Sequence, residues 1–226
     1  MTYRERRPSG DHRAGVACVW SRESALMTRT RVVPDACVDL IWHRETGALV
    51  VAGPDTGPHI AAGAGTLVGL RFRPGETALG LPVDELRDAR VALSAVWSSQ
   101  AAQELADKLA ETSDIQAAQQ VLLDSVPTVG DPVAATVRSL AAGSARVRDM
   151  ADTLGWSERQ LHRRCLAAFG YGPKVLHRVL RFQQALRTAR TGVPPAEVAA
   201  LAGFTDQSHL AREVRALAGV PLSDLR

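Results

Sequence analysis

The pattern of hydrophobic and polar positions divides the chain into two regions. In the first region, short segments rich in Val, Ile, Leu and Trp are bounded by Gly and Pro, which predicts strands at residues 16–20, 36–43, 48–52 and 66–72. Polar and apolar residues do not alternate cleanly over residues 37–43, so we expect that strand to be buried on both faces. From residue 83 the pattern becomes helical, with amphipathic stretches at residues 100–110 and 115–123. The first region is therefore predicted to be α+β.

The second region contains only helical patterns. A stretch punctuated by Pro and Gly, residues 124–132, separates it from the first region. Asp131 followed by Pro132 is typical of a helix N-cap and the first helical position. We predict two domains: a small α+β domain over residues 1–126 and an all-α domain over residues 131–226.

The all-α region contains an internal repeat. Three pairs of residues lie 48 positions apart and two pairs lie 49 apart: Ala151 and Ala199, Gly155 and Gly203, Trp156 and Phe204, then Leu161 and Leu210, Arg163 and Arg212. Each copy has the pattern of a helix-turn-helix, in which the glycine takes the left-handed conformation of the turn. The small alanine lets two helices cross closely, and the aromatic residue fills the angle between them. Ser157 in the first copy, and Thr205 with Asp206 in the second, are placed to cap the following helix.

The second helix of each copy, at about residues 157–169 and 206–217, has an inward and an outward face. The inward stripes are Leu161, Cys165 and Ala168, then Leu210, Val214 and Leu217. The outward faces carry Arg159 and Arg163 with His162 at their flank, then Ser208, Arg212 and Arg215 with Gln207 near the N-terminal end. A solvated charged surface is the alternative for either helix alone, but recurrence at matching positions favours two recognition helices. His209 lies off the outer face, so we expect it to pack or to form a hydrogen bond.

Residues 173–191 predict one continuous helix between the two copies. Apolar residues recur along it at helical spacing: Val175, Val179, Phe182 and Leu186. At about 1.5 Å per residue this helix spans roughly 25 Å. Such a rod would hold the two recognition helices about one turn of duplex DNA apart, roughly 34 Å.

The net charge changes sign between the two regions. The chain of 226 residues has a formal net charge of +3, yet residues 131–226 hold 14 basic and 8 acidic residues while residues 1–130 hold 13 and 16. A basic helical domain favours a nucleic acid partner. Codon bias is the alternative explanation for the many arginines, but it does not explain the change of sign. Aromatic residues are only 4% of the chain, which argues against a stacking platform for single strands.

Several classes of protein are excluded by what the sequence lacks. No apolar run reaches the ~18 residues that span a bilayer, and the charged start has no apolar stretch behind it, unlike a signal peptide. The three cysteines, Cys18, Cys37 and Cys165, lie far apart, which excludes a disulfide framework and a zinc finger. There is no P-loop and no GxGxxG, HExxH or GxSxG motif. We therefore expect a cytoplasmic protein that is not an enzyme and uses no cofactor and no metal.

The motifs of the repeat also occur in a known order. They read Ala151-x-x-x-Gly155-Trp156-Ser157, Phe169-Gly-Tyr-Gly-Pro173, Gly203-Phe204-x-Asp206-Gln-Ser-His-Leu-x-Arg212, and finally residues 219–226. In this order they resemble the DNA-binding domain of the AraC/XylS family of bacterial transcription regulators, over roughly residues 131–226. The resemblance implies that a single chain places two recognition helices in successive major-groove segments of a promoter operator.

The resemblance also implies which residues contact DNA: Ser157, Arg159, Gln160, His162 and Arg163 in the first unit, and Asp206, Gln207, Ser208 and Arg212 in the second. The chemistry fits, because Arg can grip guanine through two hydrogen bonds, Gln can pair with adenine, and Arg or Ser can hold phosphate. We expect Arg163 and Arg212 to be partly structural or bound to phosphate, because the repeat itself fixes them. Residues 213–215 and Leu225 depart from the usual family pattern, which affects the packing of the second unit.

The first region resembles, less sharply, a small N-terminal domain that precedes this helix-turn-helix in many bacterial regulators. The matching segments are residues 34–42, 52–54 and 69–75. By analogy of fold, this domain would sense an effector, mediate dimerisation, or both. Candidate partners are therefore double-stranded DNA, a small-molecule effector, RNA polymerase and a second copy of the chain, and no membrane.

Three residues of the first region alternate on one predicted strand and share a face. Cys37, Asp39 and His43 form a candidate metal or ligand site. The favoured interpretation is a buried Cys, an Asp bonded to the backbone and a His at a strand end. An alternative function uses Cys37 as a methyl acceptor in a regulator of the response to DNA alkylation, which requires a thiolate stabilised by a nearby cation. A further alternative is a domain that only dimerises.

Two other groups of side chains could line a binding site. Arg71 and Arg73 share a strand face and could hold an anionic effector, although solvated or salt-bridged arginines are the favoured interpretation. Trp20, Trp42 and Trp97 could line an apolar pocket, with core packing as the favoured role.

Overall fold

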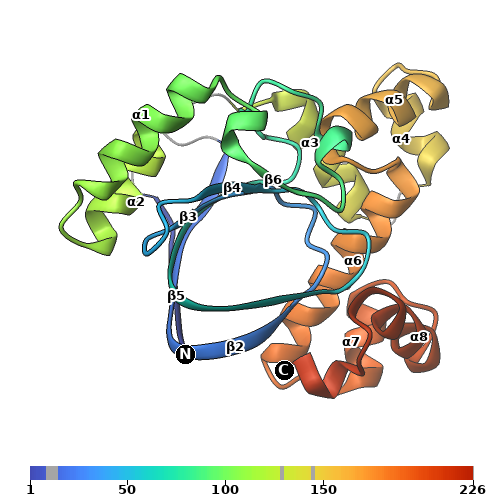
Figure 1. The fold of residues 1–226 in the computed structure, drawn as a ribbon. Coiled ribbons are helices and arrows are strands. Elements are labelled where there is room, and N and C mark those ends of the chain that lie inside the picture. The colour runs from blue at the N-terminus through green and yellow to red at the C-terminus, as the bar shows by residue number, and fades with distance from the viewer. Residues whose placement is uncertain (9–14, 128–129, 144–145, 226) are drawn as a thin grey trace.

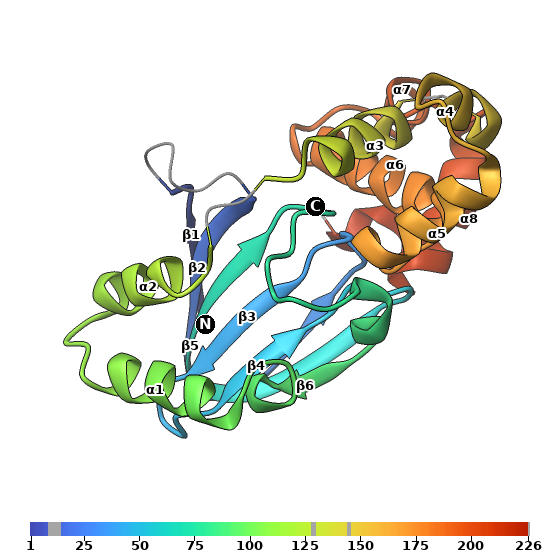
Figure 2. The same ribbon diagram turned by 90° about the horizontal axis from the view of Figure 1, so that it is seen from above.

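The computed structural model describes residues 1–8, 15–127, 130–143 and 146–225. Positions 128 and 129 of the stretch between the two regions, and the C-terminal Arg226, lie outside these residues. The N-terminal region forms a curved antiparallel sheet with two helices on its outer face, and the C-terminal region is a group of helices beside it (Figures 1 and 2). No helix in the described ranges is long and apolar enough to cross a membrane.

Six strands form one sheet in the order β1-β2-β5-β3-β4-β6, with every neighbouring pair antiparallel. They are β1 (Thr2–Arg6), β2 (Val16–Val32), β3 (Asp39–His43), β4 (Leu49–Ala52), β5 (His59–Phe72) and β6 (Arg90–Ala92). All four predicted strands are present. β2 and β5 extend well past the apolar runs that predicted them, β2 through a mostly polar and exposed end and β5 through small residues. The sequence pattern did not predict the edge strands β1 and β6.

Strand β3 is not buried on both faces, so that prediction was wrong. Leu40 and Trp42 are buried, whereas Asp39, Ile41 and His43 are only partly so. The physical reason is that one face of β3 meets the hydrophobic core while the other lines a cavity, and the cavity accepts polar side chains.

Two helices, α1 (Ser99–Ala110) and α2 (Ile115–Asp124), cover the outer face of the sheet, as Figure 1 shows. Their N-caps are Ser98, which accepts from the amide of Ala101 (3.1 Å), and Asp114, which accepts from the amide of Ala117 (2.8 Å). The predicted amphipathic stretches are thereby confirmed. Two 3₁₀ turns, η2 (Val83–Leu86) and η3 (Leu93–Ala95), precede them.

The C-terminal region contains α3 (Pro132–Ala142), α4 (Val147–Thr153), α5 (Glu158–Phe169), α6 (Pro173–Arg190), α7 (Pro195–Leu201), α8 (Gln207–Ala218) and the 3₁₀ turn η4 (Leu222–Leu225). Asp131 caps α3 by accepting from the amides of Val133 (2.8 Å) and Ala134 (3.1 Å), and Pro132 occupies the first helical position. The predicted fold class is confirmed: an α+β region followed by an all-α region with two helix-turn-helix units joined by a long helix.

Each region has its own cluster of buried apolar side chains. Among the described residues, Ala36 is the one N-terminal residue that belongs to the buried cluster of the helices. Two separate cores agree with two domains, and the boundary between residues 126 and 131 stays a prediction.

Candidate nucleic-acid interface

The first helix-turn-helix unit consists of α4 and α5. Gly155 in the turn has φ +66°, which favours glycine, and the amide of Trp156 donates to the carbonyl of Ala151 (2.9 Å). Ala151 is buried at the crossing of the two helices. The turn therefore forms as the sequence pattern predicts.

The second unit, α7 and α8, repeats this turn. Gly203 has φ +72°, the amide of Phe204 donates to the carbonyl of Ala199 (2.8 Å), and Ala199 is buried. Equivalent residues thus make equivalent backbone hydrogen bonds, so the sequence repeat is also a structural repeat.

Three of the predicted DNA-binding residues cap the helices. In the first unit, Ser157 accepts from the amide of Gln160 (3.2 Å), and the Gln160 side chain accepts from the amide of Ser157 (2.8 Å). In the second, Asp206 accepts from the amide of His209 (2.7 Å). These side chains fix where each recognition helix begins, and their contact with DNA stays a prediction.

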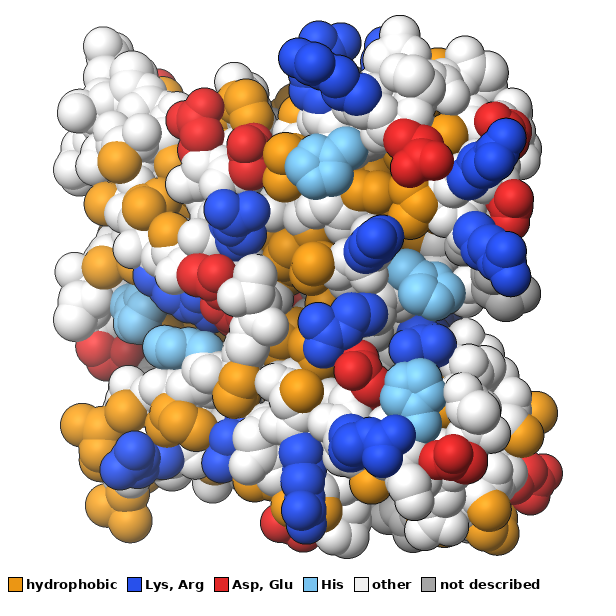
Figure 3. Space-filling view, turned by 90° about the vertical axis from the view of Figure 1, so that its right-hand side faces the viewer, with side chains coloured by type: hydrophobic (Ala, Val, Ile, Leu, Met, Phe, Trp, Pro, Cys, Tyr) orange, Lys and Arg blue, Asp and Glu red, His pale blue; other side chains and the backbone are white. Residues whose placement is uncertain are grey.

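The other predicted DNA-binding residues project into solvent from the first two turns of α5 and α8. They are Arg159, His162 and Arg163 on α5, and Gln207, Ser208 and Arg212 on α8, all exposed. Among the described residues, none of the six has a hydrogen-bond or ion-pair partner. Arg163 and Arg212 therefore make no hydrogen bond or ion pair within the described residues that would support a structural role, and their contact with phosphate stays a prediction. Figure 3 looks onto this side of the molecule, where Lys, Arg and His side chains spread over the helices with acidic residues between them.

A guanidinium covers the turn aromatic in both units. Arg164 lies over the Trp156 ring, with Cζ 4.7 Å from the ring centroid, and Arg181 of α6 lies over the Phe204 ring at 4.2 Å. His209 contacts the same Phe204 edge-on at 5.4 Å, which confirms its packing role. Sequence reasoning missed both arginines, because the first lies on the same helix as the predicted reading face and the second lies on another helix.

The unusual Glu213 of the second unit has a partner on the connecting helix. Arg178 donates through Nε to the Glu213 carboxylate (2.9 Å). The departure from the family pattern is therefore matched by an ion pair between α6 and α8 that holds the second unit to the rod.

Helix α6 is the predicted connecting rod. Its 18 residues run without interruption between the two units, which corresponds to about 27 Å at about 1.5 Å per residue. Val179, Phe182 and Leu186 are buried along one side, whereas Val175 is only partly buried. Both recognition units pack on this one helix (Figure 2), so their separation is set by its length.

The loop between β4 and β5, residues 53–58, contacts the C-terminal ends of both recognition helices. Each helix ends in a left-handed glycine, Gly170 after α5 and Gly219 after α8. A Cβ atom on Gly170 would lie 2.8 Å from Cγ of Pro54, and one on Gly219 would lie 3.3 Å from Cγ of Pro58. The β4–β5 loop therefore lies close against both units at once.

Side chains of the first region also hold the ends of these helices. Arg87 donates to the carbonyl of Gly170, directly after α5 (3.3 Å), and Arg31 donates to the carbonyl of Ala218, the last residue of α8 (3.0 Å). The hydroxyl of Tyr171, directly after α5, donates to the backbone carbonyl of Asp55 in the β4–β5 loop. These contacts connect the first region to each recognition helix separately.

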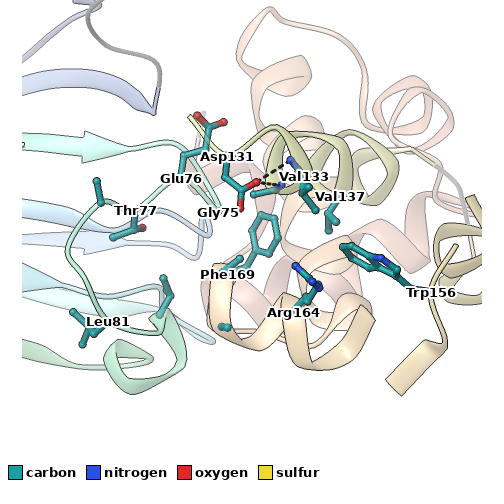
Figure 4. Close-up of a pocket in the computed structure, with 15 residues that line it drawn as sticks. Gly75, Glu76, Thr77, Leu81, Asp131, Val133, Val137, Trp156, Arg164 and Phe169 are labelled. Carbon is teal, nitrogen blue, oxygen red and sulfur yellow. Dashed lines mark hydrogen bonds between the residues drawn. The ribbon is translucent and has the colours of Figure 1, made fainter. Parts of the chain in front are cut away.

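A cavity of about 350 Å³ lies between the two regions, walled by α3, the back of α5 and residues 75–83 (Figure 4). Its charged lining groups are already engaged: Glu76 with Arg138 (2.5 Å), Asp131 as the α3 cap, and Arg164 over Trp156. This cavity is therefore a packing gap at the interface, with no charged lining group directed at a ligand.

A second cavity, of about 450 Å³, occupies the inner face of the curved sheet. It brings together the predicted Cys37, Asp39 and His43, yet no group of three or more His, Cys, Asp or Glu side chains in the described part of the chain could hold a metal. Asp39 instead pairs with Arg71 (3.0 Å) and accepts from the indole of Trp20 (2.9 Å). The salt-bridged interpretation of Arg71 is confirmed, while Arg73, just past β5, is exposed and does not line the cavity.

The three tryptophans do not share a pocket. Trp20 lines the cavity, whereas Trp42 is buried in the core on the opposite face and Trp97 is partly buried against that core. Core packing is confirmed for the latter two. The sequence analysis missed Arg22, which shares the inner face of β2 with Trp20 and could have been found from that alternation.

Burial raises the pKa of all three cysteine thiols. The pKa of Cys37 rises well above its ordinary value, first because of burial and then because of the Asp35 carboxylate, and Arg71 only partly opposes this. The pKa rises to about 11 for Cys18 and to about 12 for Cys165, again mainly through burial. A methyl acceptor needs the thiolate, so the surroundings of Cys37 oppose that alternative.

Comparison with known proteins agrees with this geometry. Residues 150–226 match the family described as "Helix-turn-helix domain", and residues 4–92 match a "Domain of unknown function (DUF6597)". The C-terminal region therefore contains a helix-turn-helix domain, and this part of the chain is similar to an HTH-type transcriptional regulator. This C-terminal domain is of the AraC type.

One relative is the uncharacterised HTH-type transcriptional regulator YbfI of Bacillus subtilis (strain 168), 32% identical over 91 residues. The match covers 39% of this chain and spans about a third (33%) of that relative.

Solved structures of ToxT from Vibrio cholerae are also similar. Apo ToxT K231A of strain SCE256 has 12% identity and a TM-score of 0.46 over 91% of this chain and 94% of that chain. ToxT of strain O395 bound to (E)-4-(8-methylnaphthalen-1-yl)but-3-enoic acid has 9% identity and a TM-score of 0.48 over 92% and 98%. Similarity this distant carries no functional argument.

Proposed function

We propose that α5 and α8 enter successive major-groove segments of one operator and read its sequence together. The observation that carries this proposal is that both helices present exposed, unpartnered polar side chains at equivalent positions of a structural repeat. The C-terminal half has a net charge of +6, which favours association with the phosphate backbone. The single rod α6 supports a fixed spacing between the two reading helices.

Within this function, the proposed contacts divide into two kinds. Arg159 and Gln207 contact base edges, because they lie at the N-terminal ends of the helices and their side chains suit guanine and adenine. Arg163 and Arg212 hold phosphates, since equivalent residues in both units are not expected to read different bases. His162, Ser208 and the caps Ser157, Gln160 and Asp206 support these contacts.

The test starts from an operator selected from random duplex DNA with the full chain. Arg159→Ala and Gln207→Ala are expected to reduce the preference for the selected site more than the total affinity. Arg163→Ala and Arg212→Ala should cost about 1–3 kcal/mol on all sequences and lower the salt slope by about 1. Arg187→Ala, an exposed arginine of α6, is the matched control and should bind as the unaltered chain does. If all four variants bind the selected site normally, the assignment of the reading helices is wrong.

We further propose that the first region regulates DNA binding by sensing an effector. The β4–β5 loop supports this, because it contributes Gly53 and Asp55 to the inner cavity and also contacts the ends of α5 and α8. A change at the cavity wall would therefore reach both reading helices through one short segment. Repeating the DNA selection with and without a metabolite extract tests this role. A domain that only dimerises would give the same operator and affinity in both conditions.

A further inference from the structure

The inner cavity has the size and lining of a small-molecule site. Its volume of about 450 Å³ falls within the ~300–1,000 Å³ of ligand pockets. Trp20, Ile41, Ile60 and Leu67 give it an apolar wall. The curved sheet that surrounds it is seen in Figure 1, where β2 and β5 bend around the interior.

All but one of the charged groups on this cavity are paired with each other. Arg71 pairs with Asp39 (3.0 Å) and also lies 3.7 Å from Asp35. Arg90 pairs with Asp55 through two hydrogen bonds, of 2.6 and 2.5 Å. These pairs lie within the wall; their three carboxylates and two guanidinium groups carry one net negative charge, and none of the three carboxylates pairs with Arg22.

Arg22 is the exception. It is only 7% exposed, its Nε has no hydrogen-bond partner, and its guanidinium has no ion pair among the described residues. A buried guanidinium without a hydrogen-bond or ion-pair partner is unfavourable, so a further partner is expected to bind it. Because Arg22 lines the cavity, the missing partner is expected to come from there.

The surroundings of Arg22 fit one negative charge on an otherwise apolar molecule. Nη2 of Arg22 lies near Gly63, where no side chain fills the space. Burial and the positive charge of Arg22 lower the pKa of His43, so its imidazole is neutral and can serve as a hydrogen-bond partner. A dianion such as phosphate would meet a single free guanidinium beside three carboxylates.

We propose that the inner cavity binds a small organic monocarboxylate, with its carboxylate on Arg22 and its apolar body against Trp20, Ile41 and Leu67. The guanidinium matches a carboxylate through two parallel hydrogen bonds, and a neutral ligand would leave it unpaired. This proposal names the ligand class for the proposed sensing role. It depends on that role only for the effect of the ligand on DNA binding.

The test is direct calorimetric titration of the full chain with 3-phenylpropanoate and hexanoate, each compared with its amide. Each acid is expected to bind at least about 10-fold more tightly than its amide, a difference of about 1.4 kcal/mol. Inorganic phosphate and a neutral polyol such as glucose should bind more weakly than the acids. Acids that bind no better than their amides, or that bind more weakly than phosphate or glucose, would overturn the proposal.

Variants place the binding on Arg22. Arg22→Met should lower the affinity for the acids at least about 10-fold, Arg22→Lys should lower it less, and Arg29→Met, an exposed arginine of the same strand, should not change it. Circular dichroism and binding to the selected operator check that each variant is folded. Acid binding unaffected by Arg22→Met in a folded chain would place the ligand elsewhere. The titration needs no DNA, so the two proposals can fail separately. If the acids bind as expected while Arg159→Ala keeps its preference for the selected site, only the assignment of the reading helices is rejected.

Discussion

The two helix-turn-helix units share a backbone frame but are stabilised from different directions. In both, a left-handed glycine and a buried alanine set the turn, and an aromatic ring fills the angle. In the first unit the guanidinium over that ring, Arg164, comes from the recognition helix itself. In the second, Arg181 comes from the connecting helix, and Arg178 adds an ion pair to Glu213.

This difference separates the parts of a unit that the fold requires from the parts that vary. Phe204 is 6% exposed, while Trp156 is partly exposed at the interface cavity, so the second unit depends more on its aromatic residue. The exposed reading side chains also differ, with two arginines and a histidine on α5 and one arginine with Gln and Ser on α8. One frame thus carries two chemically distinct surfaces.

The largest effect should come from the turn aromatics. Phe204→Ala removes a fully packed ring and is expected to lower the free energy of unfolding by about 3–5 kcal/mol. Trp156→Ala should cost clearly less, because part of its ring is already exposed and faces a cavity. Urea unfolding followed by circular dichroism measures both. Equal costs would contradict the conclusion that the units depend differently on this position.

The glycines offer a second comparison within the first unit. Gly155→Ala meets no atom within 4 Å and should cost only the left-handed backbone strain, about 1–2 kcal/mol. Gly170→Ala carries the same strain and also forces a Cβ to within 2.8 Å of Pro54, so we expect about 2–4 kcal/mol. The same unfolding measurement applies. If Gly170→Ala costs no more than Gly155→Ala, the β4–β5 loop does not press on the end of α5.

The smallest expected effect concerns the helix caps. Asp206→Ala leaves the His209 amide without its acceptor and should cost about 1 kcal/mol. Ser157→Ala should cost a similar amount or slightly less, because the Gln160 side chain still accepts from the amide of residue 157. Thermal unfolding monitored by circular dichroism, with Ser157→Thr as a capping control, measures the difference. A Ser157→Ala cost well above that of Asp206→Ala would argue against this reciprocal cap.

The helical region could be predicted closely from sequence because its signals are local. Glycine, cap and aromatic positions such as Gly155, Ser157 and Trp156 act within a few residues of each other, so spacing alone locates the turn and both helices. The sheet was predicted only in part. β1 and the far end of β2 have mostly exposed, polar residues, and the far end of β5 has mostly Ala and Gly. These segments pair through the backbone, so the sequence contains no alternating hydrophobic pattern that would predict them.

The inner cavity could not be predicted for a different reason. Arg22, Asp39 and Arg71 come from three strands, and only the order of the sheet brings them together. The polar residues of β3 indicated that one face of this strand does not pack in the hydrophobic core, but they did not show which side chain each of them would pair with. The same holds for Tyr171 and Asp55, whose contact joins positions 116 residues apart.

The uninterrupted helix α6 also limits how this chain can change in length. Each residue of an α-helix adds about 100° of rotation and about 1.5 Å of rise. A single insertion within α6 would turn the second unit to another side of the molecule and detach α8 from Arg31 and Pro58. Insertions in the turn at residues 191–194 would leave the rod intact. We therefore expect related chains to vary in length at this turn, and to keep α6 constant or change it only by whole turns.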